Sequence, residues 1–339
     1  LSQAASVEQD SAAIDKFRNP AAVDAAFEDL SVFWDDYLSV LQVTTPDPNM
    51  NSMVNVHNPR QCYMTKNWSR DLSLYQLGFG GRGLGFRDSS QDVMGMLSNA
   101  PESGKELIVK LLHVQKRDGS AMHQFFPSTM EASVGDSHEF PDRPHYYGDD
   151  HLWIILAVNA YLKETGNMDF LKETIPFYEK DSQGKALESG SVLEHLIRAV
   201  EFTWQNRGSH GLPLLGFADW NDTVNLRTGA ESNFVAAQFG KALCEMTDMT
   251  EALGDDTAAA KFRKYYDEMK TLVNRETWDG EWYLRYFDFD GSKLGSKENS
   301  HGSIFVNAQT WNIMAGFADT ERARTAMDSV NKKLNTKNG

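Results

Sequence analysis

Apolar residues recur along this chain mainly with the period of an α-helix. Between Val23 and Leu41 they stand three or four residues apart, which indicates one long amphipathic helix. Residues 149–164 are apolar nearly all round, as expected of a helix buried between neighbours. Shorter helical stripes cover 107–112, 192–203, 235–246 and 262–272. Strand-type alternation hardly occurs, so the pattern predicts an all-α fold.

Long polar loops that contain Gly and Pro separate the predicted helices. They cover residues 78–90, 117–148, 207–230 and 278–303. Loops of this length inside a compact domain usually serve a function. If the helices form antiparallel pairs with these loops at one end, they build a toroid of helical hairpins. The loop end of such a toroid would then form a deep pocket.

Composition and charge exclude some classes of binding partner. A hydrophobic content of 41% with 24% charged residues is normal for a soluble globular protein. The formal charge of −15 argues against nucleic acid and anionic membrane surfaces as partners, because phosphate groups require a basic face. The longest apolar run, Leu152–Val158, is far too short to cross a bilayer.

Cysteine and histidine usage gives two further expectations. Two isolated thiols, Cys62 and Cys244, cannot form a disulfide framework and fit a reducing compartment. The chain has no His-Glu-x-x-His or Cys-x-x-Cys motif, so no metal site is predicted. Because the sequence opens on Leu1 rather than Met and closes on a polar run, we interpret it as a piece of a longer protein.

Residues 80–92, Gly-Gly-Arg-Gly-Leu-Gly-Phe-Arg-Asp-Ser-Ser-Gln-Asp, place arginines and carboxylates on a glycine-rich backbone. Glycine lets a ligand approach the main chain closely, and the polar groups of both signs can bind hydroxyls. The segment lacks the lysine of a P-loop and the glycine spacing of a dinucleotide fingerprint. It therefore suits a sugar better than a nucleotide, although a glycine-rich turn capped by Asp88 ahead of a helix is the alternative.

A second cluster, residues 216–225, contains two carboxylates, two amides and a tryptophan. The face of Trp220 can stack on a pyranose, while Asp and Asn side chains bind its hydroxyls. A carboxylic acid beside a hydrophobic face can protonate a glycosidic oxygen, and Asp219 and Asp222 are the candidates. The alternative for Asp219 is an Asx-turn before the helix that starts near Glu231.

Two further clusters precede predicted helices. In residues 145–153, we expect Asp149 or Asp150 to cap the helix that follows rather than to bind a ligand. In residues 295–301, Lys297 and Glu298 are either a solvated charge pair or contacts to a second sugar or an anion.

In combination, Ser-Arg at 69–70, the glycine-rich segment, Asp-Asp-His-Leu-Trp, Ala-Asp-Trp-Asn-Asp and Lys-Glu-Asn resemble the inverting cellobiose and chitobiose phosphorylases. The resemblance runs from near residue 20 to about residue 316. It implies an (α/α)6 barrel of helical hairpins, with a helical linker at 1–45 and a catalytic barrel at 46–339. It further implies that an N-terminal β-sandwich and a C-terminal part are missing here, and that the full-length protein is a cytoplasmic homodimer.

The resemblance also assigns roles to individual residues. Asp222 matches the general acid of the family, and Trp220 matches the aromatic residue under the non-reducing glucosyl unit. Arg82 and Asp88 match residues that grip this unit, and Arg70 matches an arginine at the same site, with a spacing that differs by one residue from the cellobiose enzymes.

Outside the glucosyl site the match is less complete. Lys297 and Glu298 match contacts to the leaving sugar, whereas Asn307 stands near the position of a phosphate-binding His in cellobiose phosphorylases. We assign Asn307 and Gln309 to phosphate. The resemblance implies no cofactor, and inorganic phosphate is a co-substrate.

The resulting hypothesis is phosphorolysis of a β-linked glucosyl disaccharide to α-glucose 1-phosphate and a released sugar or sugar acid. Because the usual His is replaced, cellobionic acid is preferred over cellobiose, and Lys293, Lys297 or Arg285 would bind the gluconate carboxylate. One alternative is an inverting (α/α)6 hydrolase that uses Glu298 as catalytic base. The other is a non-catalytic sugar-binding barrel.

Overall fold

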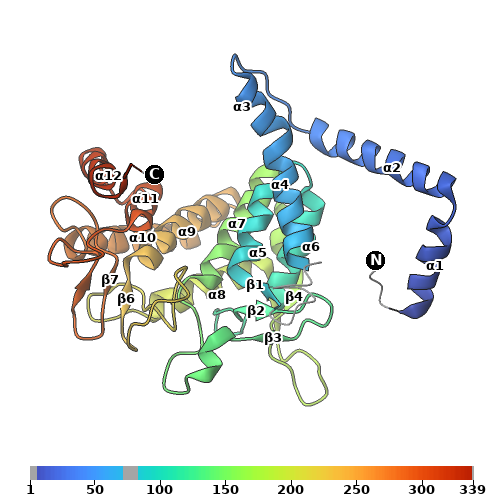
Figure 1. Ribbon diagram of the computed structural model, residues 1–339. Helices are drawn as coiled ribbons and strands as arrows, with labels where there is room; N and C mark the ends of the chain where they lie inside the picture. Colours follow the sequence, from blue (N-terminus) through green and yellow to red (C-terminus); the bar gives the residue numbers. More distant parts are fainter. Residues whose placement is uncertain (1–5, 72–82, 338–339) are drawn as a thin grey trace.

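The computed structural model describes residues 6–71 and 83–337, and most of these residues are helical (Figure 1). The prediction of a mainly helical fold is therefore confirmed. The helices are α1 Val7–Phe17, α2 Pro20–Ser39, α3 Pro48–Ser52, α4 Asn58–Met64, α5 Phe86–Met96, α6 Pro101–His113, α7 Asp150–Thr165, α8 Val192–Gln205, α9 Asn233–Ala252, α10 Asp256–Glu276, α11 Val306–Met314 and α12 Thr320–Leu334. The shorter helical turns are Met53–His57 and Thr65–Asp71, which are π-helical, and Gly135–Glu139 and Met168–Lys172, which are 3-10.

The strands are only two or three residues long and pair antiparallel in three small sheets. They are β1 Leu84–Gly85, β2 Gln124–Phe125, β3 Ala132–Ser133, β4 Thr174–Pro176, β5 Ser189–Ser191, β6 Glu231–Ser232, β7 Tyr286–Phe287 and β8 Lys293–Leu294. β1 leads directly into α5 and β6 into α9, so these strands fix the loops that precede the two helices.

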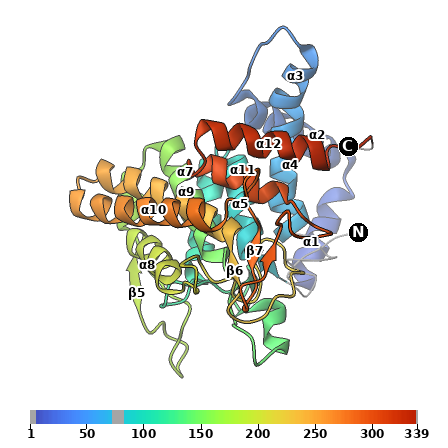
Figure 2. The same ribbon diagram turned by 90° about the vertical axis from the view of Figure 1, so that its left-hand side faces the viewer.

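From α5 onward the helices form four hairpins, α5–α6, α7–α8, α9–α10 and α11–α12. The first helices of the hairpins also pack against one another in the order α5, α7, α9, α11, which makes them a central row. Figure 2 shows α10 beside α9 and α12 beside α11. Helices that follow one another along the chain therefore pack in pairs in this part of the molecule, as the predicted hairpins require.

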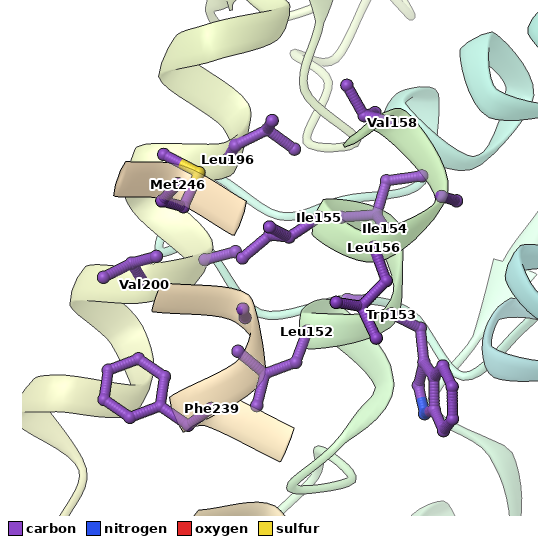
Figure 3. Packing of buried hydrophobic residues seen from close by; sticks show 14 of the residues in the cluster. Leu152, Trp153, Ile154, Ile155, Leu156, Val158, Leu196, Val200, Phe239 and Met246 are labelled. Atoms are coloured by element: carbon purple, nitrogen blue, oxygen red, sulfur yellow. The ribbon is translucent and has the colours of Figure 1, made fainter. Parts of the chain in front are cut away.

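The hydrophobic core runs through the hairpins, and Figure 3 shows the part of it where α7, α8 and α9 meet. Leu152 and Ile155 of α7 face Val200 of α8 and Phe239 and Met246 of α9, and all five side chains are fully buried. Burying one such side chain contributes about 1.5–3 kcal/mol relative to leaving it exposed. The row of apolar residues in α7 thus anchors the helix whose N-terminus carries polar residues of the site.

Two helices, α5 and α1, are harder to predict from the apolar pattern than the others. The segment 86–90, predicted as part of a loop, is the start of α5, because Arg87, Ser89 and Ser90 are polar yet buried and hide the apolar periodicity. α1 has no buried residue and no apolar stripe to predict it, but Ser6 caps its N-terminus by accepting a hydrogen bond from the Gln9 amide.

The N-terminal helices extend away from the hairpins (Figure 1). In α2 only Tyr37 is buried, and its ring lies among Phe33, Trp34 and Tyr63. The division into a linker at 1–45 and a barrel from 46 stays a prediction. In the described ranges, no helix combines the length and apolarity that a membrane span requires.

Candidate functional site

Arg87 lies at the centre of a buried charge cluster in the first turn of α5. It is 5% exposed, and its Nε and Nη2 atoms lie 2.8 and 2.9 Å from the two carboxylate oxygens of Asp149. Nη1 donates to Oδ1 of Asp222 at 2.8 Å, and Nη2 also donates to the backbone carbonyl of Asp219 at 2.9 Å. One guanidinium thus joins α5, the N-terminus of α7 and the loop before α9.

Asp149 and Asp150 begin α7, but neither behaves as a simple cap. Asp149 occupies the N-cap position, yet its carboxylate accepts from Trp153 Nε1 at 2.9 Å and pairs with Arg87 instead of the helix amides. Asp150 lies 2.8 Å from His123 Nδ1 and 3.6 Å from Arg87 Nη2. Of the two residues expected to cap this helix, Asp149 is the N-cap residue but makes no side-chain cap hydrogen bond, because the buried guanidinium binds its carboxylate.

Burial and charge shift the pKa values of this cluster in opposite directions. Burial raises the pKa of Asp149 above its ordinary value, although Arg87 opposes the shift. Burial alone would lower the pKa of His123, but the charge and hydrogen bond of Asp150 outweigh it and the net shift is upward. Burial alone would lower the pKa of Arg87, but the surrounding carboxylates raise it well above the ordinary value.

The structure separates the two candidate acids of the 216–225 cluster. Asp219 is fully buried and pairs with Arg285 at 2.7 Å, while Ser232 Oγ donates to it at 2.7 Å. Burial would raise the pKa of Asp219, but Arg285 reverses this and lowers it. Asp219 also accepts the Asn221 amide at 3.0 Å, as the Asx-turn alternative predicts. Asp222, with 57% of its side chain exposed, is the carboxylate that a substrate can reach.

The described glucosyl-site candidates are Arg70, Asp88 and Trp220. Arg70 donates from Nε to Asp92 at 2.8 Å and lies 3.7 Å from Asp88, which is the next residue after Arg87 in α5. Asp88 is in the first turn of α5, where a carboxylate favours the helix dipole, and remains partly exposed. Trp220, two residues before Asp222, is 52% exposed. Arg82 lies outside the described residues.

Lys297 and Glu298 stand on the loop before α11, and both side chains are more than half exposed. The Lys297 amide donates to Asp279 Oδ2 at 2.7 Å, and its Nζ donates to the Asp279 carbonyl at 3.0 Å. Glu298 lies 3.7 Å from Lys293. Asp279 therefore fixes this loop while the tip of Glu298 stays open to solvent.

The two residues assigned to phosphate are in different environments on α11. Gln309 is fully buried, accepts the Tyr283 amide at 2.8 Å and donates to the carbonyls of Tyr283 and Phe305 at 2.7 and 3.1 Å. Both of its amide hydrogens are thus in use, so a phosphate contact would require these bonds to break. Asn307 is half-buried near the start of the helix. In ranges 6–71 and 83–337, no group of His, Cys, Asp and Glu could hold a metal ion.

Sequence reasoning missed Arg87 and His123 as members of the site. The signal for Arg87 was its place in the glycine-rich segment next to Asp88, but nothing in the sequence shows that it is buried. The signal for His123 is weaker, because Asp150 lies 27 residues further along the chain.

Asp222 and Trp220 are thus exposed on one loop of a mainly helical domain, and a buried arginine contacts Asp222. The chain belongs to the Glycosyl hydrolase 94 superfamily, whose catalytic-domain model matches residues 33–339.

Characterised relatives carry different phosphorylase names. The chain is 30% identical over 335 residues to an N,N'-diacetylchitobiose phosphorylase of Vibrio proteolyticus, covering 94% of this chain and 41% of the relative. It is 34% identical over 261 residues to a solabiose phosphorylase of Paenibacillus borealis, covering 76% and 31%. It is 26% identical over 337 residues to a cellobionic acid phosphorylase of Neurospora crassa, covering 97% and 40%. The chain thus spans well under half the length of these relatives.

Among solved structures, a rhamnosidase from Klebsiella oxytoca with rhamnose bound is similar in fold. The TM-score is 0.55 at 12% identity, over 86% of this chain and 49% of the rhamnosidase. At this identity the similarity concerns the fold alone.

Proposed function

We propose that the protein is an inverting disaccharide phosphorylase whose general acid is Asp222. The observation that carries the proposal is the contrast between the two carboxylates of one loop: Asp219 is buried and paired, whereas Asp222 reaches solvent beside Trp220. The family membership and the phosphorylase names of the relatives support it. In the complete protein the hairpins would close into an (α/α)6 barrel, in a cytoplasmic homodimer.

An inverting phosphorylase needs one carboxylic acid, because phosphate is itself the anionic nucleophile. Asp222 donates its proton to the glycosidic oxygen as the C1–O bond breaks, and a phosphate oxygen bonds to C1 from the opposite face. A β-linked donor then gives an α-glycosyl phosphate. Trp220 stacks under the transferred glucosyl unit, and Asp88 with Arg70 binds its hydroxyls. Arg82 would complete this group.

For the leaving group we propose gluconate, with cellobionic acid as substrate and cellobiose as the next candidate. Lys293 and Lys297 are partly exposed on the loop before α11 and can offer a cation to a sugar acid. Arg285 is 1% exposed and paired with Asp219, so it is not available to bind the gluconate carboxylate. Phosphate is the co-substrate, and Asn307 remains its proposed contact.

The reverse reaction tests both the chemistry and the leaving group. The complete protein that contains this chain is supplied with α-glucose 1-phosphate and with gluconate, glucose, cellobiose or N-acetylglucosamine, and phosphate release is measured. We expect the fastest release with gluconate. A clear preference for another acceptor would contradict the sugar-acid assignment alone.

The forward reaction separates phosphorolysis from its rivals. Sugar release in phosphate-free buffer would indicate a hydrolase with Glu298 as its base. A sugar that binds without turnover, in wild type and Asp222→Asn alike, would indicate a binding barrel.

A further inference from the structure

We propose that Arg87 is the positioning residue for the general acid, and that Asp149 holds Arg87 in place for this task. The inference rests on the proposed function. Arg87 reaches Asp222 through Nη1 at 2.8 Å, while its other two nitrogens are bound to Asp149 and to the Asp219 carbonyl. Arg87 is 5% exposed and is held by Asp149 and by the Asp219 carbonyl. It therefore gives the Asp222 carboxylate a partner in a fixed position.

The loop that carries Asp222 is itself held at Asp219. The Asp219 carbonyl accepts from Arg87, and the Asp219 carboxylate is bound by Arg285. Asp222 follows three residues later and is itself mostly exposed, and the hydrogen bond from Arg87 Nη1 restrains its carboxyl group. A shift of about 1 Å in a reacting group can lower the rate by about 100-fold.

An arginine beside a general acid raises the question of how the acid can be protonated. Nη2 of Arg87 donates to Asp149 at 2.9 Å and Nε lies 2.8 Å from its other carboxylate oxygen, so Arg87 has an ion pair with Asp149 that does not involve Asp222. Asp222 can therefore take up a proton without leaving a buried guanidinium unpaired, which would be strongly unfavourable. The second carboxylate, Asp150, adds negative charge at 3.6 Å from Arg87.

The charged groups around Arg87 come from several elements. α5 contributes Arg87 and α7 contributes Asp149 and Asp150, while His123 approaches Asp150 from the segment before β2. The ring of Tyr147 stacks on His123 with centroids 3.6 Å apart. With Asp222 included, three carboxylates lie within 3.6 Å of Arg87, so the guanidinium keeps charged partners other than the general acid.

The test compares two donors in the complete protein. The disaccharide requires protonation of its leaving oxygen, whereas β-glucosyl fluoride releases fluoride with the C1–F electron pair and needs little help from an acid. In both cases phosphate forms the new bond to C1 and the product is α-glucose 1-phosphate. A defect in the acid therefore slows the disaccharide selectively, and a general loss of structure slows both donors.

For Arg87→Lys we expect kcat with the disaccharide to fall by about 100-fold and kcat with the fluoride by less than about 10-fold. Lysine keeps the charge but cannot bind Asp149 and Asp222 together. Arg198→Lys is the control, since Arg198 of α8 pairs with Glu194 of the same helix and with Glu188, which precedes β5. It should change neither rate.

Asp149→Asn is the second variant in case Arg87→Lys does not fold. It keeps the shape of the residue and removes the charge that fixes Arg87, so the same donor-selective loss is expected. An equal loss on both donors by a folded variant, or no loss on either, would overturn the role of Arg87. A wild-type protein that forms no α-glucose 1-phosphate from either donor would contradict the proposed function instead.

Discussion

The buried ion pair of Arg285 and Asp219 holds the loop at residues 216–225, and the variant Arg285→Met tests this role. Arg285→Met removes the guanidinium but keeps most of the side-chain volume, and Asp219 stays fully buried without its cation. Breaking one side of such a pair costs about 3–5 kcal/mol. Ser232 and Tyr286 still donate to Asp219, so we expect the lower end, about 3 kcal/mol.

Thermal unfolding of the complete protein at pH 7 measures this loss. With an unfolding entropy of about 2.1 cal/mol/K per residue, a destabilisation of about 3 kcal/mol lowers Tm by about 4 °C for the 339 residues of this chain, and by less for a longer protein. Lys172→Met is the control, because Lys172 and Asp169 pair on the surface, and we expect its Tm to match wild type. The double variant Arg285→Met, Asp219→Asn should recover part of the loss, since no unpaired charge remains.

The pH dependence adds a second readout of the same pair. Arg285 holds the pKa of Asp219 below its ordinary value in the folded protein. The stabilisation by ionised Asp219 is therefore complete above the unfolded pKa of about 3.9 and is lost as the pH falls further. A stability loss below about 1 kcal/mol for Arg285→Met at pH 7 would refute this account of the loop.

Three further predictions concern other residues. Burial lowers the pKa of His151 to about 4, so its stabilising effect is complete above pH 6.5 and is lost toward pH 4. Urea titrations should show that the free energy of unfolding falls less steeply with falling pH for His151→Asn than for wild type, and an equal fall in both would contradict this. Gly216 has φ 69°, and a Cβ there would lie 2.5 Å from the Tyr146 carbonyl, so Gly216→Ala should cost about 1–3 kcal/mol in thermal unfolding, and an unchanged Tm would contradict the strain. Lys293→Met should raise KM for gluconate about 10-fold and leave KM for glucose unchanged, whereas equal effects on both acceptors would remove Lys293 from the acceptor site.

The sequence predicts well those parts of the fold in which apolar residues face one core. α7 is apolar on all sides because α5, α8 and α9 surround it, and residues 149–164 show this directly. The 107–112 stripe falls inside α6, although the helix itself extends from Pro101 to His113. Local periodicity therefore predicts where helices exist, but caps and polar turns decide where they end.

The candidate site could be predicted only in part. Asp222 and Trp220 lie on one short segment, so their proximity is visible in the sequence. The contact of Arg87 with Asp149 joins residues 62 positions apart, and its contact with Asp222 joins residues 135 apart. A buried arginine needs partners that only tertiary packing provides, and the sequence therefore suggests a cap at Asp149 where the structure has an ion pair.

The most direct test of the central claim is the formation of α-glucose 1-phosphate from a β-glucosyl disaccharide and phosphate by wild type and Asp222→Asn. We expect phosphate-dependent product with the complete wild-type protein, and a kcat lower by about 100- to 10,000-fold for Asp222→Asn, with an unchanged Tm. Sugar release that does not depend on phosphate, or a folded Asp222→Asn variant within 10-fold of wild type, would contradict the assignment of Asp222 as the acid of a phosphorylase.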